Sequence, residues 1–125
     1  MSKEQFMRES LREGEVYAGL LLGKNGAPDQ HLFLLPGEVE KATWAKAKEW
    51  AEKEGGRLPT RQEQSLLFAN AKDEFKAAWY WSGEQHSASY AWVQGFGYGN
   101  QDSLNKYHEF RARAVRTIQL SASVI

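Results

Sequence analysis

Two helix patterns follow one another closely near the middle of the chain, and they restrict the folds that the chain can adopt. Over residues 43–54 (TWAKAKEWAEKE), apolar residues recur at three- and four-residue spacing, which predicts a helix with one apolar face. The glycine pair at 55–56 ends it, because glycine adopts the left-handed C-cap conformation without strain. Thr60 and Glu63 then form the capping-box pattern of a second helix, which runs to about Asn70.

Strand patterns flank this helix pair on both sides. Residues 15–22 (EVYAGLLL) and 31–35 (HLFLL) are apolar and enclose a turn-rich segment, which predicts a β-hairpin. From residue 79 onward the chain has short β-prone segments, including 89–94, and residues 111–118 (RARAVRTI) are typical of a closing strand. A hairpin, two helices and then short strands is an α+β order.

The length of 125 residues is that of one ordinary domain, and no linker-like stretch divides it. We assign residues 1–12 to a polar, amphipathic lead-in, residues 13–120 to a single domain and residues 121–125 to a tail. A helix in the lead-in is too short to be stable alone, so it must dock or fray. The N-terminus lacks the apolar core of a signal peptide, and no apolar run reaches the length of a membrane span.

The composition excludes several kinds of chemistry. The chain has no cysteine, so it has no disulfide, thiol nucleophile, thiolate zinc site or iron–sulfur cluster. Its 16 Lys and Arg balance 16 Asp and Glu, so no net charge attracts nucleic acid or anionic lipid. The three histidines show no diagnostic metal spacing, and no dense acidic cluster offers oxygen ligands to Ca²⁺. We expect no metal, no cofactor, no nucleic-acid partner and no membrane partner.

Five short motifs follow one another in an order that is typical of a known group of proteins. They are Gly56-Arg57-Leu58-Pro59-Thr60, Tyr80-Trp81-Ser82-Gly83, Tyr90-Ala91-Trp92, Phe96-Gly97-Tyr98-Gly99 and the arginine-rich segment 111–116. In this order they resemble bacterial and phage proteins with a C-type-lectin-like fold, which are related to formylglycine-generating-enzyme-like proteins. The resemblance covers residues 14–118, and the leucine-rich hairpin is most similar to phage and prophage members.

This resemblance implies a fold and a kind of activity. The fold is a C-type-lectin-like α+β domain in which N- and C-terminal strands pair and two helices flank short, mainly antiparallel sheets. Formylglycine-generating enzymes act through cysteines, which this chain lacks, so we expect no enzyme of that kind. Calcium-dependent sugar binding uses a proline-containing loop, whereas Gln101-Asp102-Ser103 has no proline. Phage relatives present loops that grip host receptors, which implies a virion-associated protein or one in the host cytoplasm.

Residues 79–110 hold nine of the 16 aromatic residues, mixed with Gly, Asn and Ser. Tyrosine among small polar residues is the composition of an antibody paratope, and aromatic faces also stack on sugar rings. The segment therefore predicts a ligand-binding face. The candidate ligand-binding residues are Trp81, Glu84, His86, Tyr90, Trp92, Gln94, Tyr98, Asn100, Gln101, Asp102, Asn105, Lys106 and Tyr107.

Some of these aromatic residues also suit a core. Trp81 lies in a β-prone run and is expected to be buried, although it is also in the candidate set. In the strand at 89–94 two registers are open, one that turns Trp92 toward a ligand and one that turns it into the core. Tyr98 and Tyr107 lie among glycine, asparagine and lysine, so we expect both to be exposed.

The arginines of residues 111–116 are predicted to be structural rather than phosphate-binding. We expect them to pair with Glu84, Glu109 or Asp73, because an arginine beside a sheet must satisfy its donors.

Three functional hypotheses follow. The favoured one is a non-enzymatic phage or prophage domain that recognises a protein or glycan through its aromatic, Gly/Asn/Tyr-rich loops. The second is a phage assembly or interaction protein, an oligomer or an inhibitor of a host protein, which the leucine-rich hairpin and the lead-in suggest. The third is a metal-dependent enzyme built on His31, His86 and His108.

Overall fold

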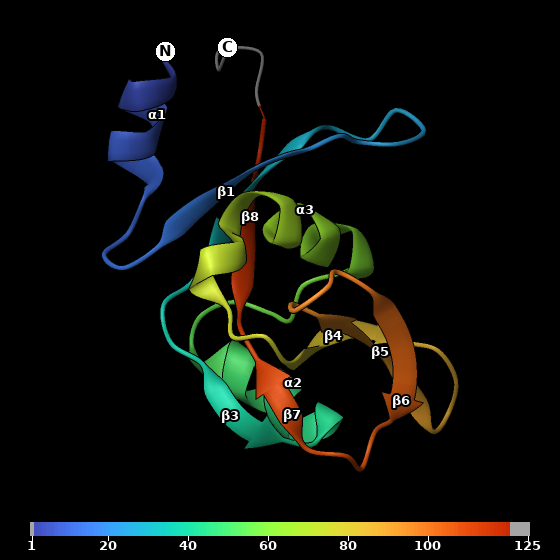
Figure 1. Ribbon diagram of the computed structural model, residues 1–125. Coiled ribbons are helices and arrows are strands. Elements are labelled where there is room, and N and C mark those ends of the chain that lie inside the picture. The colour runs from blue at the N-terminus through green and yellow to red at the C-terminus, as the bar shows by residue number, and fades with distance from the viewer. Residues whose placement is uncertain (1, 121–125) are drawn as a thin grey trace.

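Two β-sheets form the framework of the protein in the computed structural model, which describes residues 2–120. One sheet has three strands in the order β1-β2-β8, and the other has five in the order β3-β7-β4-β5-β6 (Figure 1). The strands are β1 (Val16–Leu21), β2 (Gln30–Leu34), β3 (Val39–Ala42), β4 (Trp79–Gln85), β5 (Tyr90–Gly95), β6 (Gln101–Asn105), β7 (Phe110–Ala112) and β8 (Val115–Gln119). The pairings are antiparallel except that of β4 with β7. The tail predicted at residues 121–125 and Met1 lie outside the described residues.

Three α-helices complete the described residues: α1 (Lys3–Ser10), α2 (Trp44–Lys53) and α3 (Arg61–Ala71), the last followed by a 3-10 turn, Lys72–Glu74. The α+β class, the opening hairpin and the central helix pair are therefore confirmed. Strand β2 of that hairpin pairs with the closing strand β8. The lead-in helix α1 docks, because its Phe6 is buried against His31 and Phe33 of β2.

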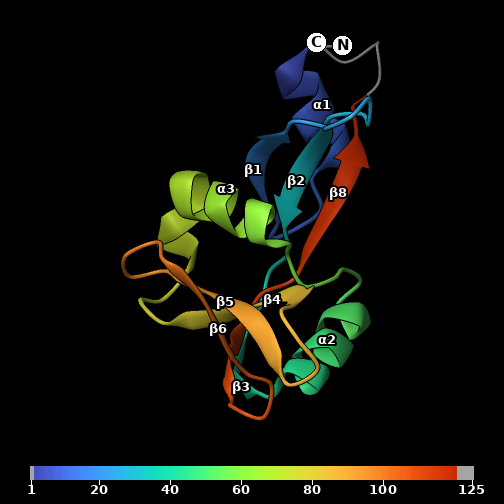
Figure 2. The ribbon, with the colours of Figure 1, turned by 90° about the vertical axis from the view of Figure 1, so that its right-hand side faces the viewer.

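The core has two parts, which lie on either side of the junction between the sheets. Beneath α2, the small side chains of Ala47 and Ala51 allow the helix to approach Trp81 and Val93 of the five-stranded sheet. The second part joins α3 to the three-stranded sheet, with Leu67 of the helix among its buried members. Helix α3 thus lies between the two sheets and contacts β1, β4 and β5 (Figure 2). Its N-terminus consequently faces the strands that carry the predicted ligand face.

The closing segment differs from the prediction of one strand. Residues 111–118 divide into β7 and β8, which belong to different sheets, and Arg113 lies in the crossing between them. The buried Arg113 guanidinium donates to the carbonyl oxygens of Leu35 (2.8 Å) and Glu74 (2.6 Å). These bonds satisfy the carbonyl groups of two other segments where the chain changes sheets.

The predicted partners of the arginines are wrong, although their structural role is supported. Arg111 pairs with Glu38, and Arg116 pairs through two nitrogens with Glu15 (2.7 and 2.8 Å). Both carboxylates precede strands that lie far away in the sequence, so spacing along the chain gave no indication of them. The pairs fasten β7 and β8 to the N-terminal third of the chain.

Candidate ligand-binding surface

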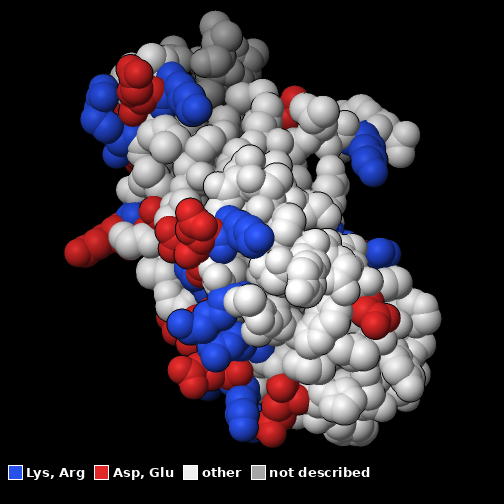
Figure 3. All heavy atoms as spheres, viewed as in Figure 1, with Lys and Arg blue, Asp and Glu red and all other residues white. Residues whose placement is uncertain are grey.

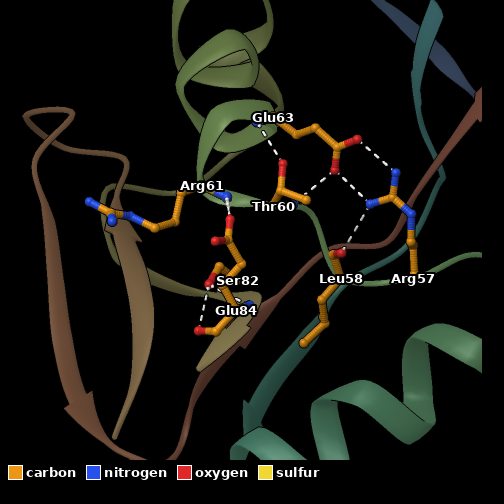
Figure 4. Close-up of polar contacts among 7 residues, drawn as sticks. All are labelled: Arg57, Leu58, Thr60, Arg61, Glu63, Ser82 and Glu84. Carbon is orange, nitrogen blue, oxygen red and sulfur yellow. Dashed lines mark hydrogen bonds and ion pairs between the residues drawn. The ribbon is translucent and has the colours of Figure 1, made fainter. Parts of the chain in front are cut away.

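The start of α3 is fixed by a network centred on the buried carboxylate of Glu63 (Figure 4). The Thr60 hydroxyl accepts from the Glu63 amide (3.1 Å) and Glu63 accepts from the Thr60 amide (2.8 Å), which is the predicted capping box. Both terminal nitrogens of Arg57 donate to the same carboxylate, at 2.6 and 2.7 Å. The hydrogen bond to Glu63 raises the pKa of Arg57. The segment from Arg57 to Thr60 therefore has a structural role, because its contacts with Glu63 fix where α3 begins.

The first residue of α3, Arg61, connects the helix to the five-stranded sheet. Its amide donates to the Glu84 carboxylate at 2.7 Å, and its Nε donates to the Gln101 side chain at 3.0 Å. Its guanidinium lies over the Trp92 ring, 3.6 Å from the centroid. Figure 4 shows this side chain extending from α3 toward the strands, away from Arg57. The sequence analysis missed Arg61, because no local pattern relates it to Trp92.

Two of the predicted ligand-binding residues are buried and do not belong to a ligand face. Trp81 is fully buried, and its indole nitrogen donates to the Ala42 carbonyl at 2.8 Å. Gln94 is 1% exposed and accepts from Gln101 at 2.8 Å. Trp81 lies opposite Val93 in the register of β4 and β5, and this side of the sheet packs beneath α2. Trp81 is therefore a core residue, which was the other expectation for it, and Gln94 is covered as well.

Strand β5 shows which side of the segment at 89–94 faces the core. Ala91 and Val93 are buried, whereas Tyr90 is exposed and Trp92 is half-buried beneath Arg61. His86 meets the Trp92 ring edge-on, with 5.2 Å between the ring centroids. Asn105 of β6 pairs with Tyr90 in the adjacent register position. The outer side of β5 therefore carries two aromatic side chains, with His86 from the segment after β4 and Asn105 from β6 next to them.

Four of the remaining predicted residues lie at the two ends of the β5–β6 hairpin, and Asp102 lies within β6. Tyr98 and Asn100 are exposed in the turn, beside an open groove of about 560 Å³ that we call the turn groove. Lys106 and Tyr107 follow β6 and line a smaller hollow of about 230 Å³ next to Trp44 of α2. Asp102 is exposed and alternates with its neighbours onto the opposite side of β6.

The predicted residues thus form an extended surface and not one pocket. Within the described residues, Tyr90, Tyr98 and Tyr107 are among the large apolar side chains that are exposed, at 44%, 95% and 86%. Figure 3 shows largely uncharged surface over β5 and β6, with most of the charged groups elsewhere on that view. Rings and amides therefore make up much of this surface, with few charged groups among them (Figure 3).

The three histidines do not meet in the structure. His31 is buried against Phe6, and a hydrogen bond joins its Nδ1 to the Tyr17 hydroxyl (2.7 Å). His86 lies beside Trp92, and His108 lies beside Phe110. Over residues 2–120, no group of three or more His, Asp or Glu side chains could hold a metal ion.

Comparisons with known proteins give no relative from which a function could be transferred, so a functional assignment depends on this surface. No family model matches the chain, and no curated protein matches it. In the described part of the chain, no helix is long and apolar enough to cross a membrane.

Proposed function

We propose that this protein is a non-enzymatic ligand-binding domain of a phage or prophage, with a C-type-lectin-like fold. It recognises a protein or a glycan through the surface that β4, β5, β6 and their loops present between Glu84 and Tyr107. The pairing of β2 with β8 and the placement of two helices against the sheets support the fold. The lack of cysteine removes the thiolate chemistry of the related enzymes.

The observation that carries the proposal is the exposure of Tyr98 and Tyr107. Both rings are almost fully exposed, at 95% and 86%, although each could bury a large apolar area in a contact. Burying apolar surface contributes roughly 25 cal/mol per Å², so two rings supply a substantial share of a binding free energy. Neither ring contributes to the core, and both lie on short turns that follow paired strands.

A double variant tests the proposal. Tyr98→Ala/Tyr107→Ala should keep the wild-type melting temperature, because neither ring is buried, and should lose binding to whatever the wild-type protein captures. Immobilised wild-type and variant proteins are compared on a printed glycan panel and in an extract of bacterial cells. Equal capture by the two proteins, or no capture by the wild type on either panel, contradicts the proposal.

One observation favours the second candidate, an assembly or interaction protein. The opening hairpin exposes Leu20 and Leu22, at 38% and 68%, on a surface separate from the one described above. Leu22→Ser is expected to convert any oligomer into a monomer in light scattering, without changing the melting temperature. A strictly monomeric wild-type protein would remove this candidate as an oligomer.

A further inference from the structure

The turn groove lies between residues 77–79 and the turn that joins β5 to β6. Trp79 and Tyr98 are among its lining residues, all of which are uncharged, and the Tyr98 side chain is 95% exposed beside it. The Asn100 amide also lines it. An uncharged groove with aromatic walls suits a neutral ligand that has apolar faces, because no side chain in it can pair with an ion.

The turn contains three glycines, at positions 95, 97 and 99, and the fold constrains them to different degrees. Gly99 has a φ of +84°, and a Cβ there would come within 2.7 Å of the Phe68 ring. A Cβ on Gly95 would come within 2.9 Å of the Asn100 side-chain oxygen. The fold therefore requires glycine at position 99, whereas a side chain at position 95 would displace the Asn100 side chain.

Gly97 has no such requirement. It is not among the glycines with positive φ, and a Cβ there would meet the Ala77 Cβ at 3.6 Å, an ordinary contact distance. Gly97 and Ala77 both line the turn groove, so a side chain at 97 would occupy groove space without disturbing the core. The packing of the fold therefore does not require glycine at position 97, and its absent side chain leaves space in the groove.

Polar groups in the groove are also left available. Within residues 2–120, the Trp79 indole nitrogen, the Tyr98 hydroxyl and the Asn100 amide make no side-chain hydrogen bond, whereas the indole nitrogens of Trp44 and Trp81 both do. Hydrogen-bond donors and acceptors are therefore available on the same residues that supply the aromatic rings and on Asn100 beside them. Hydroxyl groups around an apolar ring match that arrangement.

We propose that the turn groove is a subsite for a neutral pyranose sugar ring. The inference rests on the proposed function and specifies its ligand class at one end of the surface. The sugar stacks an apolar face on Tyr98 or Trp79, the bare backbone at Gly97 allows it to approach closely, and Asn100 exchanges hydrogen bonds with its hydroxyl groups.

The experiment is saturation-transfer NMR on the full chain with methyl α-D-glucopyranoside, methyl β-D-galactopyranoside and N,N′-diacetylchitobiose as separate probes. At least one probe should receive saturation from the wild type and from Glu49→Ala, a control on the exposed face of α2. Gly97→Ala should weaken that binding by roughly tenfold through steric exclusion, and Tyr98→Ala by a similar factor through loss of stacking. Thermal melts of all variants establish that each is folded.

Two outcomes overturn the subsite. One is the absence of saturation transfer to every probe, and the other is transfer that neither Gly97→Ala nor Tyr98→Ala reduces. If no sugar binds but protein capture from bacterial extract depends on Gly97, the groove takes a peptide and the sugar assignment is wrong. Capture that depends on Tyr107 alone would leave the proposed function intact while overturning this subsite.

Discussion

Replacing Glu63 with alanine removes the acceptor that holds the start of α3 in place. The carboxylate accepts one hydrogen bond from the Thr60 amide and two from Arg57. Loss of the capping interaction costs about 1 kcal/mol. A fully buried pair would add several kcal/mol, but the Arg57 side chain is 44% exposed and regains water, so its share is about 1–2 kcal/mol. The free energy of unfolding should fall by about 2–3 kcal/mol, which lowers the melting temperature by about 10 °C.

Chemical denaturation followed by circular dichroism measures this effect. Glu63→Gln keeps an acceptor for the Thr60 amide and removes the charge, so its cost should be about half as large. Glu49→Ala, on the exposed face of α2, is the matched control and should stay within about 0.5 kcal/mol of the wild type. If Glu63→Ala behaves like this control, the network is not what positions α3, and the reasoning fails.

Three further predictions concern the turn glycines and two titrating groups. Gly99→Ala should lower the free energy of unfolding by about 2–4 kcal/mol, because position 99 has a positive φ and a Cβ there would clash with the Phe68 ring. Gly97→Ala should change it by no more than about 0.5 kcal/mol, and equal costs for the two variants would contradict the packing described. Burial, with a hydrogen bond to a carboxylate, raises the pKa of Tyr80 to about 12. Because the unfolded tyrosine ionises near 10, stability should fall as pH rises above 10, and less steeply in Tyr80→Phe; parallel losses would exclude Tyr80 as the cause. The hydrogen bond from Arg116 lowers the pKa of Glu15 below its usual 4.5, so the stability that this ion pair contributes should be lost as pH falls from about 4.5 through the folded-state pKa. In acid denaturation, Glu15→Gln should lose stability less steeply than the wild type over this range. An unchanged slope would contradict the assignment to Glu15.

Local patterns predicted the elements of this fold well, because each depends on residues that are neighbours in sequence. The capping box of Thr60 and Glu63 appears in the structure as its spacing indicates. The strand at 89–94 alternates as expected, but its sequence left both registers open, and the structure shows that Ala91 and Val93 are the buried residues. The class α+β follows from the order of those elements. The division of the closing segment at Arg113 did not, because it depends on carbonyl groups supplied by two distant segments.

The candidate surface was predictable only where exposure follows from local composition. Tyr98 and Tyr107 lie among small polar residues and are exposed, as expected. Trp81 and Gln94 were wrong as ligand contacts, because Trp81 packs in the core beneath α2 and Gln94 is buried where it accepts a hydrogen bond from Gln101. The stacking of an arginine from α3 on the outer side of β5 needed the tertiary arrangement of helix and sheet.

The central claim is that ligand recognition occurs on the surface between residues 84 and 107. The most direct measurement is a backbone amide chemical-shift map of the ¹⁵N-labelled protein, recorded as the glycan or protein captured by the wild type is added. The account predicts that the shifted amides cluster in β5, β6 and the turns that carry Tyr98 and Tyr107. Shifts confined to the opening hairpin around Leu20 and Leu22, with residues 84–107 unchanged, would contradict it.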